Sequence, residues 1–278
     1  MGQKSLVRYG KKENISKEGT FKENISKASI SKEALFQETI SVVIPCYNEE
    51  EGIPYLAEKI NAALPELLKK YAVELIFVDD GSTDKTNQLL YQHFGKMLSV
   101  KIVTHEKNRN LGAALRTGFA HASGDYVAAL DSDCTYDPAL LLPLLNLMDK
   151  RTDIITVSHY HPQGKVSNVP RYRIFLSKGA SFLYRVLLDW NLYTYTAMVR
   201  VYKKKVIQDV SFERNNFLGV TELLVKAMLK GYKVKELPAE LNVRKFGMSK
   251  MKVIPLKVIK GHLGLLGYIV QQKVTGRV

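Results

Sequence analysis

The sequence is short of the features that define several large protein classes. Its 278 residues include only two cysteines, Cys46 and Cys134, which lie far apart and form no C-x-x-C pair. This scarcity excludes a small fold stapled by disulfides and argues against zinc-ribbon and thioredoxin-type sites. Two isolated cysteines are most compatible with a reducing compartment, so we expect a cytoplasmic protein.

Long apolar runs are also missing. The longest uncharged stretches, at 138–148, 190–199 and 261–272, are shorter than the roughly 18–20 residues that a membrane span needs. The opening residues, MGQKSLVRYGKKENISK, contain no apolar core of a secretory signal. We therefore expect a protein that is soluble or lies peripherally on the cytoplasmic face of a membrane.

The charge of the chain is strongly positive but unevenly distributed. The formal net charge of +14 divides into +3 for residues 1–38, −5 for 41–150, +6 for 151–225 and +10 for 226–278. A basic surface suits nucleic acid, yet no helix-turn-helix, zinc-finger or RNP-like pattern is present, so we do not expect nucleic-acid binding. A basic C-terminal half that faces an anionic substrate or membrane is the favoured interpretation.

The pattern of apolar residues predicts where the folded domain begins. Residues 1–38 are polar and contain KENISK twice, which favours a disordered tail. From residue 39, strand-like runs at 39–45, 73–80, 99–105 and 125–133 alternate with helical patterns at 53–71, 82–94 and 109–122. Unalternated apolar strands between helices predict an α/β fold, with a Rossmann-like, mostly parallel central sheet flanked by helices.

The second half is less regular. We expect a strand at 153–158, a helix at 171–188, a strand-like run at 194–202 and a helix at 219–230. The segment 251–278 combines apolar residues with lysines and is expected to be a basic amphipathic helical extension. Two interpretations of this extension stay open: it lies in a membrane interface, or it packs on the domain or on a second copy.

Polar clusters follow three of the predicted strands. They occupy residues 47–49, 79–81 and 131–133, and ligands of parallel sheets bind beyond the carboxyl ends of the strands. The D-x-D pair Asp131 and Asp133 offers hard oxygen ligands for Mg²⁺ or Mn²⁺. Asp79 and Asp80 can accept hydrogen bonds from a ribose or a base, although helix capping would also explain them.

Four ordered motifs carry a family resemblance. VVIPCYNEEEGI (42–53), VDDGSTDKT (78–86), NRNLGAALRTGF (108–119) and GDYVAALDSD (124–133) resemble the nucleotide-sugar domain of inverting family 2 glycosyltransferases, which have the GT-A fold. A looser similarity covers 236–251, where Arg244, Gly247, Ser249 and Lys250 match the R-x-x-G-x-S-K signature of dolichol-phosphate-mannose synthases and related polyprenyl-phosphate sugar synthases. The resemblance implies a GT-A domain over 39–250, with a nucleotide-sugar half (39–140) and an acceptor half (141–250).

The resemblance also implies roles for individual residues. The donor nucleotide would be held by Pro45, Tyr47, Glu49, Asp79 and Asp80, and Asp131 and Asp133 would carry the metal on its diphosphate. The implied catalytic residues are Asp133, Glu222, Arg244 and Lys250. The basic half suggests Arg171, Arg173, Arg200 and Ser249 as partners of an acceptor phosphate. For Glu222 a simpler alternative is a helix-surface pair with Lys226, four residues on.

Three functions remain under consideration at this point. The leading hypothesis is metal-dependent, inverting transfer of a hexose from a nucleotide sugar of the GDP-mannose or UDP-glucose type to a polyprenyl or dolichyl phosphate. A phosphate acceptor is already largely dianionic at pH 7, since its second pKa is ~6, and it needs arginines rather than a base. A saccharide or other hydroxyl acceptor would instead need a general base such as Glu222. The third hypothesis is a catalytically silent nucleotide-sugar-binding protein.

The sequence departs from the family pattern at three places. Thr135 stands where a metal-binding Gln is frequent, and VSHYHPQGKV (157–166) stands where an Arg is frequent. His159 and His161 have the spacing of a metal pair, but the following Pro-Gln-Gly favours a loop that contributes hydrogen bonds near the sugar. Ala197 and Met198 replace a small polar pair. The sugar and the oligomeric state are not predictable from these features.

Overall fold

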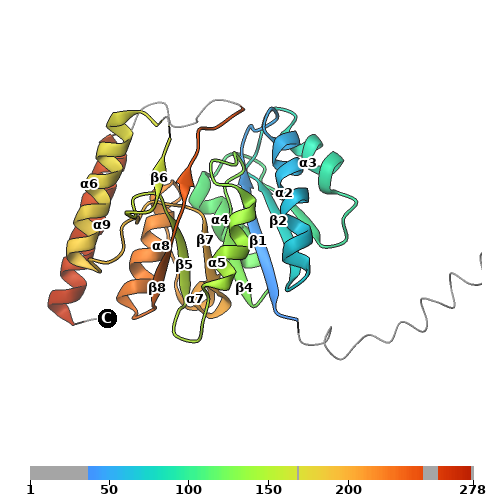
Figure 1. Ribbon diagram of the computed structural model, residues 1–278. Helices are drawn as coiled ribbons and strands as arrows, with labels where there is room; N and C mark the ends of the chain where they lie inside the picture. Colours follow the sequence, from blue (N-terminus) through green and yellow to red (C-terminus); the bar gives the residue numbers. More distant parts are fainter. Residues whose placement is uncertain (1–36, 168, 247–255, 277–278) are drawn as a thin grey trace, which may run out of the picture. The chain divides into compact units, whose positions relative to one another are not determined.

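A seven-stranded sheet forms the centre of the unit that begins at Glu38 (Figure 1). The structure, a computed structural model, describes residues 37–167, 169–246 and 256–276. The predicted tail therefore lies outside the described residues, except for its last two positions. The strand order is β3-β2-β1-β4-β7-β5-β8. Neighbouring strands run parallel, except that β7 runs antiparallel to both β4 and β5. The α/β prediction with a mostly parallel sheet is confirmed.

The chain order of the elements follows the predicted alternation. The first half contains β1 (Thr39–Cys46), α2 (Ile53–Leu68), β2 (Ala72–Asp79), α3 (Thr86–Phe94), β3 (Val100–Thr104), α4 (Leu111–His121) and β4 (Tyr126–Ala129). The second half contains a 3₁₀ turn (Pro138–Leu140), α5 (Leu141–Asn146), β5 (Ile154–Ser158), α6 (Arg171–Leu187), β7 (Arg200–Lys203), α7 (Lys204–Asp209), α8 (Leu218–Leu229), β8 (Val234–Pro238) and α9 (Leu256–Thr275). A two-stranded sheet pairs β6 (Lys165–Val166) with β9 (Glu240–Leu241).

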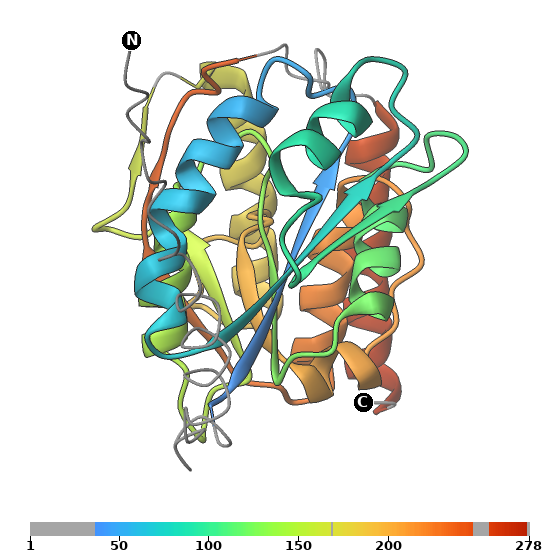
Figure 2. The same cartoon turned by 90° about the vertical axis from the view of Figure 1, so that its right-hand side faces the viewer.

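Helices cover both faces of the sheet, which explains why its strands are apolar on both sides. Ile40, Val42 and Ile44 of β1 pack with α2, α3 and α5, whereas Val43 faces α4. Figure 2 shows α2 and α3 on one face and α4 on the other, with α9 beyond it. An apolar helix face on each side removes β1 from water, and this burial drives the layered arrangement.

Two long helices, α6 and α9, lie side by side at one end of the sheet (Figure 1). Leu265 and Ile269 of α9 are buried against α8, so this helix packs on the domain along one side. Within the described residues, we find no helix that combines the length and the apolar character needed to cross a bilayer.

Some predicted boundaries are wrong for identifiable reasons. The strand-like run at 194–202 is a strand only from Arg200, because the N–H groups of Tyr193 and Thr194 donate to the Glu236 carboxylate instead of to a neighbouring strand. The helix expected from residue 82 begins at Thr86, since the N–H of Ser82 donates to Asp79 and that of Thr83 donates to Asn48. Side-chain acceptors therefore divert backbone donors away from regular structure.

Gly118 sets how closely α4 approaches the sheet. A Cβ atom at this position would overlap Val43 Cγ1 and crowd Val78, whereas a Cβ at Gly267 of α9 would meet nothing within 4 Å. We expect Gly118→Ala to lower the free energy of unfolding by about 1–3 kcal/mol through overpacking. The matched Gly267→Ala should raise it by up to about 1 kcal/mol, because alanine favours the helix. Urea unfolding of both variants checks this, and effects of the same sign would contradict it.

Candidate active site

The loops after β1 and β2 are tied together at the carboxyl edge of the sheet. Asn48, which has a positive φ of 51°, donates its N–H to Ser82 Oγ at 3.0 Å and accepts from the N–H of Thr83 at 2.8 Å. The N–H of Glu49 donates to Thr86 Oγ1 at 2.7 Å. These bonds fix Glu49 beside the start of α3. Pro45 is buried within β1, and Tyr47 is half-buried just beyond that strand.

The paired aspartates after β2 have different partners. Asp79 stabilises the local loop, because its carboxylate accepts hydrogen bonds from the Ser82 N–H and from the Asn87 amide. Asp80 accepts through Oδ1 from the N–H of Arg109 at 2.9 Å and from Nδ1–H of His105 at 2.7 Å. Asp79 therefore stabilises the turn before α3 and does not cap that helix, while Asp80 is held at the site edge.

His105 is a site residue that the sequence analysis did not identify. Its Nδ1 bonds Asp80, and its Nε2 is hydrogen-bonded to the Thr117 hydroxyl at 2.9 Å, so the ring links the end of β3 to α4. Gly81 allows the loop after β2 to lie close to the loop after β3. It has a φ of +70°, and a Cβ there would overlap the backbone of Lys107. A polar residue at the very end of a predicted strand was the available signal.

The D-x-D pair follows β4, which ends at Ala129. Asp133 accepts from the N–H of Thr135 at 3.0 Å, which folds the loop back on itself. Burial raises the pKa of Asp131 well above its ordinary value, and the nearby carboxylates of Asp133 and Glu49 add to this effect against the opposing charge of Arg244. Two half-buried carboxylates in one turn form a site where a cation is strongly favoured.

Arg244 reaches this acidic cluster from the segment that follows β9. Its guanidinium donates to Glu49 at 2.8–3.1 Å and to Asp133 Oδ2 at 3.0–3.1 Å. The structure therefore brings together the predicted residues Glu49, Asp133 and Arg244. The neighbouring segment is anchored in turn, because the N–H of Asn242 donates to the Thr135 carbonyl at 2.9 Å.

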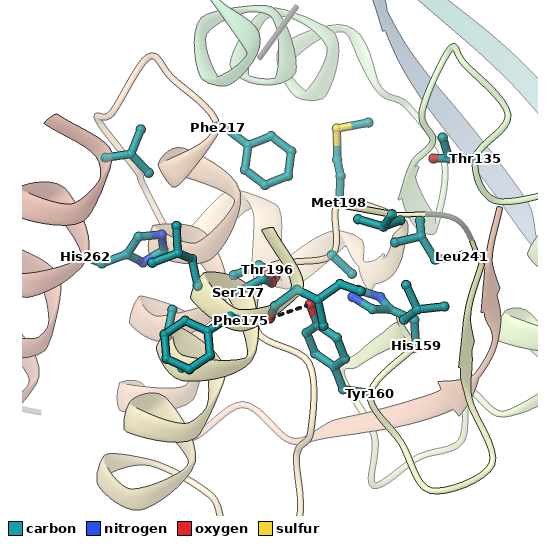
Figure 3. A pocket seen from close by; sticks show the side chains of 18 of the residues that line it. Thr135, His159, Tyr160, Phe175, Ser177, Thr196, Met198, Phe217, Leu241 and His262 are labelled. Carbon is teal, nitrogen blue, oxygen red and sulfur yellow. Dashed lines mark hydrogen bonds between the residues drawn. The ribbon is translucent and has the colours of Figure 1, made fainter. Parts of the chain in front are cut away.

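A cavity of about 480 Å³ opens beside the D-x-D pair. Asp131, Asp133 and Thr135 line one end, and apolar side chains of α6 and α9, such as Phe175 and Leu263, line the rest. Figure 3 shows Phe175 and Ser177 of α6 and His262 of α9 on one side, with His159 and Thr135 on the other. The cavity thus runs from a charged end to an apolar end.

His159 stands on the wall of this cavity as a neutral residue. Burial, with a smaller contribution from Lys178, lowers its pKa to about 4, and its Nδ1 hydrogen-bonds the Tyr136 hydroxyl. His161 instead packs its ring on Tyr193, with ring centroids 5.3 Å apart. The two histidines therefore have separate partners. Among the described residues, no group of three or more His, Cys, Asp or Glu side chains is arranged to hold a metal ion.

The prediction that Arg200 binds an acceptor phosphate is wrong. Its side chain is completely buried, and its guanidinium donates to Thr156 Oγ1 and to the carbonyls of Val220 and Tyr195. These bonds join β7, β5 and the start of α8. Arg200 is consequently a structural residue of the core, since a buried charge must be compensated by fixed acceptors.

Glu222 is also placed differently from the prediction. Both of its oxygens are engaged: Lys226 donates to Oε1 at 2.8 Å, and the N–H groups of Arg214 and Glu213 donate to Oε2. Although burial acts in the opposite direction, these donors hold the pKa of Glu222 below its ordinary value. Glu222 is not among the described residues that line the cavity, so the geometry gives it a loop-stabilising role.

The remaining predicted residues lie at the N-terminal end of α6 or outside the described part. Arg171 is exposed at the first position of α6. Arg173 belongs to the same helix, but its side chain lies outside the described residues, as do Ser249 and Lys250. Their roles therefore stay predictions.

Comparison with known proteins gives this site its context. Residues 41–211 match the family described as Glycosyl transferase family 2, and the chain belongs to that family. It is 33% identical to a dolichol-phosphate mannosyltransferase of Pyrococcus furiosus, over 77% of this chain and 59% of that protein. It is 30% identical to a polyprenol monophosphomannose synthase of Mycolicibacterium smegmatis, over 76% of this chain and 80% of that protein. The family resemblance is thereby confirmed.

The chain spans only part of the length of two of the relatives that it matches. The chain spans 59% of the Pyrococcus protein and 64% of an undecaprenyl-phosphate 4-deoxy-4-formamido-L-arabinose transferase of Salmonella paratyphi A, to which it is 29% identical over 78% of its own length. These relatives, as named, act with dolichol, polyprenol and undecaprenyl phosphate carriers.

Solved structures show the same fold. Glucosyl-3-phosphoglycerate synthase from Mycobacterium tuberculosis, crystallised with Mn²⁺ and UDP-glucose, has a TM-score of 0.62 at 21% identity, over 83% of this chain and 79% of that chain. The same enzyme with Mg²⁺ and UDP gives a TM-score of 0.61, over 83% and 80% of the two chains. The expected GT-A fold is confirmed.

The placement of Glu222 leads to a prediction about activity. We expect Glu222→Gln to reduce stability while leaving sugar-transfer turnover within about tenfold of wild type, far less than the ~10²–10⁴-fold contribution of a general base. Steady-state kinetics together with thermal unfolding check this. A loss of several orders of magnitude with an intact fold would restore the role of general base.

Proposed function

We propose that this glycosyltransferase transfers a hexose from a nucleotide sugar to a polyprenyl phosphate, with inversion at the anomeric carbon and with a divalent metal ion as cofactor. One observation carries the proposal: the cavity that Asp131 and Asp133 line is otherwise lined mostly by apolar side chains, many of them from α6 and α9. A long isoprenoid chain matches the apolar part, and its phosphate would lie near the acidic end, where a bound divalent ion and Arg244 would supply positive charge. The carrier-lipid relatives support the same acceptor class.

The residues at the charged end fit Mg²⁺ or Mn²⁺. Asp131 and Asp133 are half-buried carboxylates, and burial together with the neighbouring carboxylates of Asp133 and Glu49 raises the pKa of Asp131. Magnesium is commonly held by one or two carboxylates together with substrate phosphates and water. Asp131 and Asp133 would hold the ion, which would neutralise charge on the leaving diphosphate.

The chemical step follows from the acceptor. An oxygen of the acceptor phosphate attacks the anomeric carbon and forms the new C–O bond, while the bond from that carbon to the diphosphate oxygen breaks. The electron pair leaves with the nucleoside diphosphate. No proton has to be removed from a dianionic phosphate, which agrees with the engaged carboxylate of Glu222. We assign Arg244 to the stabilisation of phosphate charge, and Arg171, Arg173, Ser249 and Lys250 to the acceptor side.

We further propose that α6 and α9 rest on the surface of a membrane. Apolar side chains of both helices are exposed, with Phe175 at 78% and Val274 at 81%. The others are Phe182, Leu183, Val186, Ile259, Leu263 and Val270, and Trp190 follows just after α6. Soluble proteins rarely expose contiguous apolar area of this kind without a partner.

The charges of the same two helices complement an anionic lipid surface. Neither α6 nor α9 contains an Asp or a Glu. The basic residues of the pair are Arg171, Arg173, Lys178, Arg185, Lys257, Lys260 and Lys273. An apolar face rimmed by cations binds bilayers through both burial and attraction to anionic headgroups. Because side chains of both helices line the cavity, an acceptor lipid would enter it from the bilayer.

A transfer assay tests the proposed reaction. The full chain is incubated with Mn²⁺, a polyprenyl phosphate and either radiolabelled GDP-mannose or radiolabelled UDP-glucose, and label is counted in the organic phase. We expect one donor to label the lipid and Asp133→Ala to abolish transfer. Asp137→Ala, which removes a nearby carboxylate paired with Lys59, should retain activity within about tenfold, at a stability cost of about 1 kcal/mol for a lost helix cap.

The outcomes separate the candidate functions. Label that moves only to soluble saccharides would favour a hydroxyl acceptor. No transfer with either donor, together with nucleotide-sugar binding, would favour the silent binding protein. Full activity of Asp133→Ala would exclude its role at the metal.

The single tryptophan of the chain allows a direct test of the membrane surface. Trp190 is 56% exposed, so we expect its fluorescence to shift to shorter wavelength with phosphatidylglycerol vesicles. Phe182→Ser should weaken vesicle binding by about tenfold or more, because burying a phenylalanine contributes about 1.5–3 kcal/mol. In the control, Trp190→Phe combined with Leu98→Trp moves the probe to an exposed loop, where no shift is expected. A shift at residue 98 but not at 190 would contradict the proposed orientation.

A further inference from the structure

Arg244 joins carboxylates that belong to two different parts of the proposed site. Its Nη1 donates to both oxygens of Glu49, at 2.8 and 3.1 Å, while its Nε and Nη2 donate to Asp133 Oδ2 at 3.1 and 3.0 Å. Glu49 belongs to the donor loop after β1, and Asp133 belongs to the D-x-D turn after β4. One guanidinium therefore bridges the two loops. Its fork of N–H donors makes contacts that a lysine would not reproduce.

The contact uses the oxygen atoms that a cation needs. Asp133 Oδ1 accepts from the Thr135 N–H, and Asp133 Oδ2 accepts both donors from Arg244. A divalent ion binds through carboxylate lone pairs, so the guanidinium and the ion are directed at the same part of Asp133. Since only about a sixth of each side chain is exposed, water screens this interaction weakly.

The negative charge of the cluster can be compensated either by the Arg244 guanidinium or by a divalent metal ion. Glu49, Asp131 and Asp133 are three carboxylates within one electrostatic neighbourhood, and Arg244 lies in contact with two of them. Like charges this close repel one another unless a cation lies between them. The guanidinium serves this function in the structure, as a metal ion would.

The segment that carries Arg244 is held in place next to Tyr55, and open space lies beside its guanidinium. Lys245 lies over the Tyr55 ring at 4.7 Å, and Phe246 packs on the same ring with centroids 5.4 Å apart. A second cavity, of about 470 Å³, is lined by Arg244, Lys245, Tyr55 and Lys59, so there is open space beside the guanidinium.

We propose that Arg244 is an internal competitor of the divalent ion for Asp133, and that loading of metal and donor transfers its guanidinium from Asp133 to phosphate. This inference rests on the proposed metal-dependent function. It adds a coupling: metal affinity depends on where the Arg244 guanidinium lies, and the guanidinium leaves Asp133 as the donor binds. By occupying Asp133, Arg244 lowers the affinity for the metal ion. This effect is additional to its proposed contact with phosphate.

Mn²⁺ binding to the full chain tests the competition without any turnover. Free Mn²⁺ is counted by electron paramagnetic resonance, first with Mn²⁺ alone and then with GDP or UDP added. We expect Arg244→Gln to bind Mn²⁺ about tenfold more tightly than wild type in the absence of nucleotide, within the 5–150-fold range common for coupled sites. With nucleotide added, the difference should shrink, because the guanidinium has then left Asp133 in the wild type.

Two further variants separate competition from a general charge effect. Arg244→Lys keeps the charge but loses the fork, so its affinity should lie between those of wild type and Arg244→Gln. Lys245→Gln removes one positive charge from the same segment, and its affinity should stay within about twofold of wild type, as for other exposed charges. If Lys245→Gln tightens Mn²⁺ binding as much as Arg244→Gln does, the proposal is overturned.

A stability measurement guards against misfolding of the variant. Thermal unfolding with and without Mn²⁺ should show a larger stabilisation of Arg244→Gln than of wild type, since tighter binding to the folded state raises the transition temperature. Equal or weaker Mn²⁺ binding by a folded Arg244→Gln overturns the competition and leaves the proposed function intact. Failure of every variant to bind Mn²⁺ in the presence of either nucleotide overturns both.

Discussion

The placement of several carboxylates at one edge of a parallel sheet is the constraint on which the rest of the site depends. β2, β1 and β4 are neighbours, so their ends bring Asp79, Asp80, Glu49, Asp131 and Asp133 together. Unscreened, such a cluster would destabilise the fold. The chain compensates with backbone N–H donors, with His105 and with Arg244. The loops are therefore arranged so that their donors compensate this negative charge.

This compensation divides the carboxylates into two kinds. Asp79 and Glu222 have donors on both oxygens, and the pKa of Glu222 is held down. Asp131 lies at the opposite extreme, since burial and its neighbours raise its pKa well above the ordinary value. A carboxylate fully supplied with donors stabilises a loop, whereas one short of positive charge favours binding a cation. Sequence motifs alone do not make this distinction.

The sequence was sufficient for features that are local or ordered along the chain. Apolar runs predicted the strands of the first half, and motif spacing predicted that Glu49 and Asp133 would share an edge. Arg200 and Glu222 were misplaced because burial depends on contacts across the fold: Arg200 donates to a carbonyl of α8, 20 residues away. The apolar neighbours Val199 and Val201 were a signal that the strand carrying Arg200 is buried. His105 and Tyr136 had no motif to identify them, since their importance comes from partners on other elements.

The uneven charge of the chain also has a structural explanation. The acidic edge belongs to the first half, and the carboxylate-free helices α6 and α9 belong to the basic second half. The main cavity touches both, because Asp131 and Asp133 line one end and Ile174 and Ile259 lie near the starts of the two helices. A substrate with a phosphate at one end and a hydrocarbon chain at the other experiences the same change of environment along its own length. In the proposed reaction, the phosphate would therefore reach Arg244 and the D-x-D turn only when the chain lies between α6 and α9, so lipid recognition and positioning for attack become one event.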